Sequence, residues 1–70
     1  MSDVYEPMLT WFAGTHLPPH LFAVSEPFLA LAETMVRELP RTPERTVALR
    51  KLLESKDAAV RCAVAMEAEG

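Results

Sequence analysis

Residues 42–67, TPERTVALRKLLESKDAAVRCAVAME, decide the fold predicted for this chain. Thr42 is a favoured N-cap residue, Pro43 suits the first helical position, and Glu44 places a negative charge in the first turn. No glycine or proline follows Pro43 in this stretch, so one helix is expected over about residues 43–67. Its apolar stripe recurs at helical spacing and consists of Leu49, Leu52, Leu53, Ala59, Val60, Ala63 and Val64.

A second helix is predicted upstream, over about residues 18–39. Its apolar residues also recur every three or four positions, at Leu21, Val24, Phe28, Leu31, Met35 and Leu39, with Phe22, Ala32 and Val36 widening the stripe. Pro27 lies inside this pattern and removes one backbone hydrogen bond. Because the periodicity continues through Pro27, we expect one kinked helix. The short connection around Pro40 predicts that this helix forms an antiparallel hairpin with the helix over residues 43–67.

A short helix is expected at the N-terminus, over about residues 7–13. Pro7 suits its first turn, Glu6 complements the helix dipole, and Gly14 is a candidate C-terminal cap. So short a helix is not stable alone and must pack on another element. With no alternating pattern typical of strands, the sequence predicts an all-α fold, in which residues 1–70 form one helical-hairpin domain.

The composition is that of a globular chain, with 50% apolar and 24% charged residues and a net charge of −3. No apolar run approaches the roughly 20 residues that cross a bilayer, and the acidic Asp3 and Glu6 argue against a signal peptide. Cys62, the one cysteine, excludes an intrachain disulfide and is expected to be a small packing residue. His16, His20 and Cys62 lack the spacing of zinc ligands. The sequence therefore predicts a cytoplasmic chain with no metal site.

Self-association is expected from size alone, since chains below about 70–80 residues rarely gain enough stability from one core. A hairpin also buries only one face of each helix, which leaves an apolar face for other subunits. Catalysis is not expected, because no serine or cysteine lies in a recognisable nucleophile motif. We predict no catalytic residue and no cofactor.

Basic residues gather at the start of the helix predicted over residues 43–67. Residues 41–51 carry four bases against Glu44, a local charge of +3. The bases are Arg41, Arg45, Arg50 and Lys51. Thr46 and Arg50 are four positions apart, so one hydroxyl and one guanidinium can hold one phosphate. The alternative is a solvated helix surface. Long nucleic acid is not expected as a partner, because the chain is acidic overall.

Two further features allow two interpretations each. Trp11 and Phe12 are either a stacking platform, worth roughly 1–3 kcal/mol per stacked base, or a core or interface anchor. Lys56 falls inside the apolar stripe and is expected to extend its ammonium group to water, with a subunit or ligand interface as the alternative. Asp57 and Arg61 can form an ion pair on the outer face of the helix.

Two stretches resemble a known family. One is WFxxxHLPxxL over residues 11–21, continuing as VSxPF over residues 24–28, and the other is ERTVALRKLLExKDAAVR over residues 44–61. Together they resemble the small phage proteins known as anti-CBASS sponges, which sequester cyclic oligonucleotide signals of bacterial immunity. The helical hairpin of that family is shared with phage sponges that block Thoeris signalling. The resemblance covers about residues 8–64.

The resemblance implies a homo-hexamer in the host cytoplasm that captures cyclic dinucleotides, cyclic trinucleotides or both without cleaving them. It implies that an N-terminal aromatic, Trp11 or Phe12, stacks on a base, and His16 lies in the same stretch. It also implies phosphate contacts from basic and hydroxyl side chains, for which the candidates are Arg45, Thr46, Arg50 and Lys51. Glu26 stands where relatives often carry a base, so retention of the trinucleotide pocket is expected in preference to the dinucleotide pocket.

Two rival hypotheses come from other functional classes. In the first, the chain is an oligomeric helical adaptor that binds a protein partner through its apolar face. In the second, it is a phosphodiesterase that degrades the signal. Charge reversal at Arg50 separates the sponge from the adaptor. Recovery of unchanged ligand separates the sponge from the phosphodiesterase.

Overall fold

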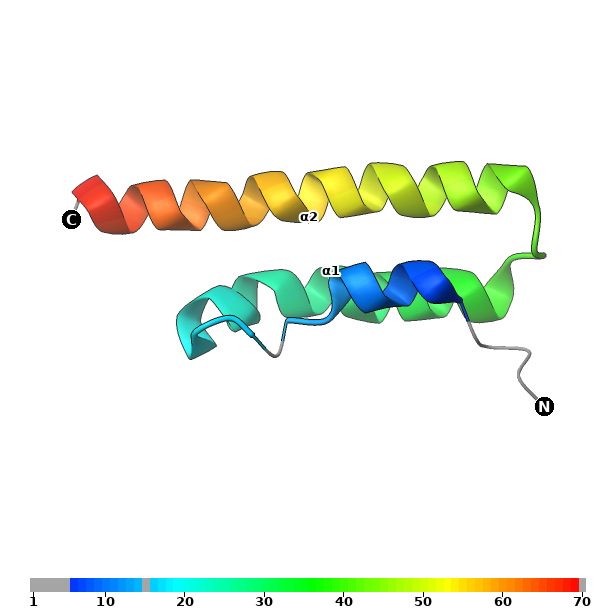
Figure 1. Cartoon of the computed structure of the whole chain (residues 1–70), viewed down its shortest axis with the longest axis horizontal. Helices are drawn as coiled ribbons and strands as arrows, with labels where there is room; N and C mark the ends of the chain where they lie inside the picture. Colours follow the sequence, from blue (N-terminus) through cyan, green and yellow to red (C-terminus); the bar gives the residue numbers. More distant parts are fainter. Residues whose placement is uncertain (1–5, 15, 70) are drawn as a thin grey trace.

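The computed structural model describes residues 6–14 and 16–69, with side chains as far as Met66. Three helices follow one another, the 3-10 helix η1 (Pro7–Phe12), α1 (Pro19–Glu38) and α2 (Pro43–Glu69). Figure 1 shows α1 and α2 running antiparallel, with η1 alongside them. The described part of the chain contains no strand, which confirms the predicted all-helical hairpin. Asp3 lies outside the described residues.

The N-terminal helix is a 3-10 helix because its hydrogen bonds span three residues. The Leu9 N–H donates to Glu6 O at 3.0 Å, and the Ala13 N–H donates to Thr10 O at 3.3 Å. The Glu6 carboxylate accepts from the Met8 N–H at 3.3 Å, so Glu6 caps the start of the helix. The sequence predicts only that Glu6 complements the helix dipole, and the structure adds this capping hydrogen bond.

Gly14 does not cap this helix in the left-handed conformation that the sequence suggests. No glycine in the described chain has a positive φ, and the cap position is the extended Ala13. Gly14 is instead needed for a close approach to α1. A Cβ atom there would lie 2.6 Å from Ser25 Oγ and 2.9 Å from Phe22 Cδ1. Both distances are too short for a side chain at position 14.

Helix α1 runs through Pro27 without interruption, as the periodicity predicts. Its buried residues are Leu21, Ser25, Ala32 and Val36. The predicted stripe is therefore displaced, since Leu31 is 49% exposed and Leu39 is 42% exposed. The sequence pattern cannot separate residues that face α2 from residues on an adjacent, uncovered side of α1.

Helix α2 begins as predicted, because Thr42 Oγ1 accepts from the Arg45 N–H at 3.2 Å. Leu49 is fully buried, but the stripe weakens toward the C-terminal end, where Val64 is 46% exposed. Cys62 is also exposed, which corrects the expectation that it packs. These residues lie where α2 has passed the main core and few neighbours remain to cover it.

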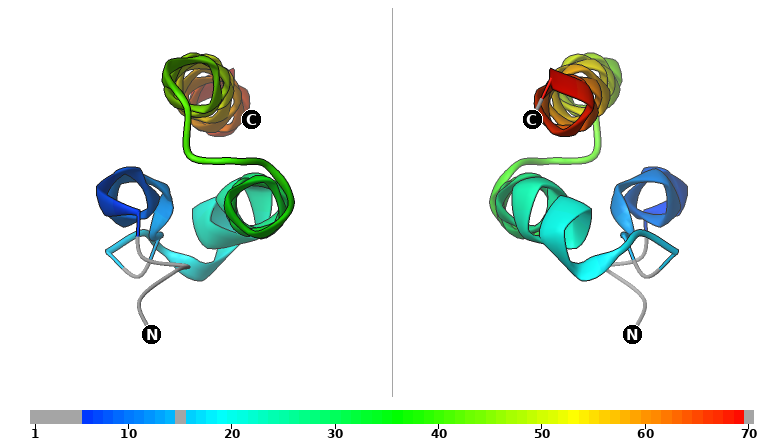
Figure 2. Two further views of the ribbon diagram at one scale, coloured as in Figure 1. Left: turned by 90° about the vertical axis from the view of Figure 1, so that its right-hand side faces the viewer. Right: turned by 90° about the vertical axis from the view of Figure 1, so that its left-hand side faces the viewer.

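The core lies where all three helices meet. Seen end-on in Figure 2, α2, α1 and η1 occupy the corners of a triangle. Phe12 from η1, Ala32 and Val36 from α1 and Leu49 from α2 form the buried cluster. One aromatic from the short helix thus fills the space between the two long helices.

The hairpin has one flank that η1 covers and one that it leaves open. A hollow lined by Leu9 of η1 together with Glu33 and Arg37 of α1 shows which side of α1 faces η1. At about 100° per residue, Leu31 is about 200° from Glu33 and therefore lies on the opposite flank. Phe28 and Met35 are partly buried and lie on the same side of α1 as Leu31.

Candidate functional site

A hollow of about 480 Å³ lies between the N-terminal segment and the middle of α2. It is lined by Thr10, Trp11, Ala13, His16, Leu53, Lys56 and Asp57. Its volume falls within the range of about 300–1,000 Å³ that small-molecule sites occupy. It brings together two predicted site residues, Trp11 and His16, with a cation and a carboxylate from α2.

The adjacent aromatic residues have opposite environments. Trp11 is 65% exposed and lines the hollow, whereas Phe12 is fully buried in the core. Successive residues of a 3-10 helix point about 120° apart, which explains the difference. Phe12 is therefore the core anchor. Of the two rings only that of Trp11 is exposed, so the stacking interpretation stays a prediction for Trp11 alone.

Lys56 does not extend into open water. It is 8% exposed, and its Nζ lies 2.9 Å from Asp57 Oδ1. The Asp57 side chain is itself 49% exposed at the rim of the hollow. Asp57 therefore pairs with Lys56 rather than with Arg61, which corrects the predicted outer-face pair. A nearly buried ammonium group beside a half-exposed carboxylate gives the hollow both a donor and an acceptor.

Arg45, a predicted phosphate ligand, is instead buried and forms its hydrogen bonds within the chain. Its guanidinium donates to Val36 O at 3.2 Å and to Leu39 O at 3.3 Å. The carbonyl of Val36 would normally accept from the residue four positions later, but Pro40 has no N–H. Arg45 supplies the missing donor, and its positive charge favours the C-terminal end of α1.

The same guanidinium forms the ion pair that fastens η1 to the hairpin. Arg45 Nη2 donates to Glu6 Oε1 at 2.7 Å, and both side chains are almost completely buried. Burial by itself would raise the pKa of Glu6, but the hydrogen bond from the Met8 N–H and the charge of Arg45, with a smaller effect from Arg41, lower it below 4.5. Glu6 is therefore held in its charged form.

The other predicted phosphate ligands lie on different sides of α2. Thr46 is partly buried, while Arg50 and Lys51 are exposed. At about 100° per residue, Thr46 and Arg50 lie on the same flank as Asp57, and Lys51 lies about 120° away from Asp57. The structure thus brings Thr46 and Arg50 to the side of the hollow. It places Lys51 on the outer face and buries Arg45, so the four predicted phosphate ligands do not form one patch.

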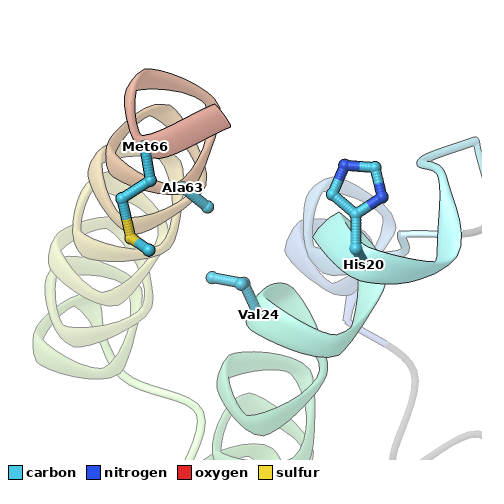
Figure 3. A pocket seen from close by; sticks show the side chains of 4 residues that line it. All are labelled: His20, Val24, Ala63 and Met66. Carbon is cyan, nitrogen blue, oxygen red and sulfur yellow. The ribbon is translucent and has the colours of Figure 1, made fainter. Parts of the chain in front are cut away.

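A second hollow, of about 620 Å³, lies at the open end of the hairpin. Figure 3 shows His20 and Val24 from the start of α1 opposite Ala63 and Met66 from the end of α2. Three of its four lining residues are apolar, and the fourth is His20. The hollow beside Trp11 therefore offers the richer set of groups for a polar ligand.

Comparisons with protein-family models, with curated proteins and with solved structures find no match for this chain. Among the described residues, no group of three or more histidine, cysteine or acidic side chains could hold a metal ion. Nor does any described helix combine the length and apolar character that a membrane crossing requires.

Sequence reasoning missed Asp57 and Leu53 as parts of the site. A signal for the first was present, since a lysine inside an apolar stripe followed directly by an acid indicates a partly buried charge pair. No such signal exists for the ion pair between Glu6 and Arg45, because 39 positions separate them.

Proposed function

We propose that this chain is a non-catalytic binding protein that sequesters a cyclic oligonucleotide in the host cytoplasm. The observation that carries the proposal is the exposed indole of Trp11 in a hollow that also contains His16, Lys56 and Asp57. An exposed aromatic beside polar groups is the usual arrangement for stacking a base. The resemblance of residues 11–28 and 44–61 to anti-CBASS sponges supports the same ligand class.

In this proposal one base stacks on Trp11 and its edge meets the polar groups of the hollow. The phosphates extend along α2 toward Arg50 and Thr46. Arg50 precedes Asp57 by seven positions, or about 10.5 Å along the helix axis. One nucleotide can span that length from base edge to phosphate. The exposed guanidinium of Arg50 would then contact the phosphate.

The chain is proposed to act as a homo-oligomer, with a hexamer as the expected form. The uncovered flank of the hairpin supports this proposal, since Leu31 and Met66 remain exposed there and at the open end. A small helical chain gains stability by covering such a surface with another copy. Light scattering at several concentrations measures the assembly directly, and a concentration-independent monomer would contradict it.

The function is tested by calorimetry of the purified chain against cyclic dinucleotides and cyclic trinucleotides. We expect binding with no change in the ligand recovered after denaturation, whereas a cleaved ligand would indicate a phosphodiesterase. Trp11→Ala should weaken binding by about 5- to 150-fold, the equivalent of one lost stacking contact. Val47→Ala, which truncates a 39% exposed apolar side chain of α2 that does not line the hollow, is the matched control and should bind normally.

A second candidate function is an adaptor that binds a protein through the open flank. The exposure of Leu31, Val64 and Met66 favours it. Arg50→Glu separates the two functions, because it should abolish nucleotide binding and spare an apolar protein contact. Arg37→Glu, on the exposed side of α1, is the control for charge reversal alone. Absence of binding heat with both ligand classes would favour the adaptor.

A further inference from the structure

Asp57 is the acceptor group at the rim of the hollow. Lys56 Nζ holds its Oδ1 at 2.9 Å, and about half of the Asp57 side chain remains exposed. A carboxylate has about four lone-pair positions on its two oxygens, so the ion pair leaves capacity for further donors. Lys56 is only 8% exposed and lines the hollow together with Leu53, so its ammonium group holds the carboxylate in position.

An acid at this place is unexpected for a site that binds an anion. The net charge of the chain is already −3, and phosphate groups would be repelled by a further carboxylate. A carboxylate in a nucleotide site is favourable when it faces donor groups of the base rather than the phosphates. Trp11 and Asp57 line the same hollow, so a base stacked on the indole brings its edge to the carboxylate.

We infer that Asp57 makes this site selective for guanine, an inference that rests on the proposed function. The Watson–Crick edge of guanine presents two adjacent donors, the N1–H and the N2 amino group, and one carboxylate accepts both. Adenine presents one donor beside the N1 acceptor, which the carboxylate repels. A site built on a particular hydrogen-bonding pattern rejects the analogue that lacks it. Asp57 is therefore the specificity-determining residue, and Trp11 stacks on either purine.

The test compares ligand pairs that differ only in their bases. We measure calorimetric affinities for cyclic dinucleotides built from two guanosines or two adenosines, and for cyclic trinucleotides with and without one guanosine. The guanine-containing member of the ligand class that binds should bind at least about tenfold more tightly. Equal affinities, or a preference for adenine, would overturn the inference and leave the proposed function standing. No binding of any ligand would overturn both.

Asp57→Asn supplies a readout that a merely structural role would not change. An amide offers a donor beside an acceptor, which matches the edge of adenine. The variant should therefore lose the guanine preference and gain affinity for the adenine ligand. Glu54→Gln, which neutralises an exposed acid one turn earlier on α2, is the matched control and should keep the preference. An unchanged preference in Asp57→Asn, with unchanged thermal unfolding, would refute the role of Asp57.

Discussion

Arg45 of α2 and Glu6 before η1 meet at 2.7 Å although 39 positions separate them in the chain. The same guanidinium also closes the end of α1, where Pro40 cannot donate to Val36 O. One side chain thus joins all three helices at the turn of the hairpin. Because η1 carries Trp11, this contact also positions one wall of the candidate site.

Replacing Arg45 should destabilise the fold strongly. Arg45→Met leaves the Glu6 carboxylate and two carbonyl oxygens without their donor, and breaking a buried pair in this way costs about 3–5 kcal/mol. Urea unfolding monitored by circular dichroism measures the loss. Arg50→Met removes an exposed guanidinium and should change the free energy of unfolding by less than about 0.5 kcal/mol. Equal effects of the two substitutions would contradict the role of Arg45.

Glu6 should make stability depend on pH in the acid range. Its pKa in the folded chain lies below the ordinary value of 4.5, so the folded state favours the charged carboxylate more than the unfolded state does. The stabilisation is complete above pH 4.5 and is lost as the pH falls through the lowered pKa. Between neutral pH and pH 3, the urea midpoint of Glu6→Gln should therefore fall less than that of the native chain. Parallel losses would show that Glu6 does not contribute.

Adding a methyl group at Gly14 should strain the contact between the N-terminal segment and α1. The new Cβ would lie 2.6 Å from Ser25 Oγ, so Gly14→Ala is expected to cost about 1–3 kcal/mol. Removing that oxygen relieves part of the clash. The double variant with Ser25→Ala should therefore be less destabilised than the sum of the two single variants in a double-mutant cycle. Simple additivity would show that the close approach is not the cause.

The adjacent aromatics should respond in opposite ways to truncation. Phe12→Ala removes a fully buried ring and should cost about 3–5 kcal/mol of unfolding free energy. Trp11→Ala removes an exposed ring and should change stability by less than about 0.5 kcal/mol. Thermal unfolding of the two variants, compared side by side, measures the difference. A large loss in Trp11→Ala would place the indole in the packing rather than in the site.

Lys56→Met tests whether the nearly buried ammonium group serves binding more than stability. Because the Asp57 side chain is half-exposed to water, removal of Lys56 leaves no buried unpaired charge, and the free energy of unfolding should change by less than about 1 kcal/mol. Nucleotide affinity should fall by about tenfold, because the uncompensated carboxylate then repels the ligand. Calorimetry and urea unfolding together distinguish this result from a general loss of structure.

The sequence alone determined the helices and their order. Thr42, Pro43 and the unbroken stretch that follows predicted the start of α2 correctly, and continued periodicity carried α1 through Pro27. These features are local, because caps and hydrophobic spacing act within a few turns of one helix.

Only the tertiary structure decided which side chains are available for a ligand. It buried Phe12 beside an exposed Trp11 and paired Arg45 with Glu6. Each of these outcomes depends on how η1 lies against the hairpin, and helical spacing carries no information about contacts between elements. Of the four predicted phosphate ligands only Thr46 and Arg50 lie on one flank of α2, since nearness in sequence does not place residues on one face of a helix.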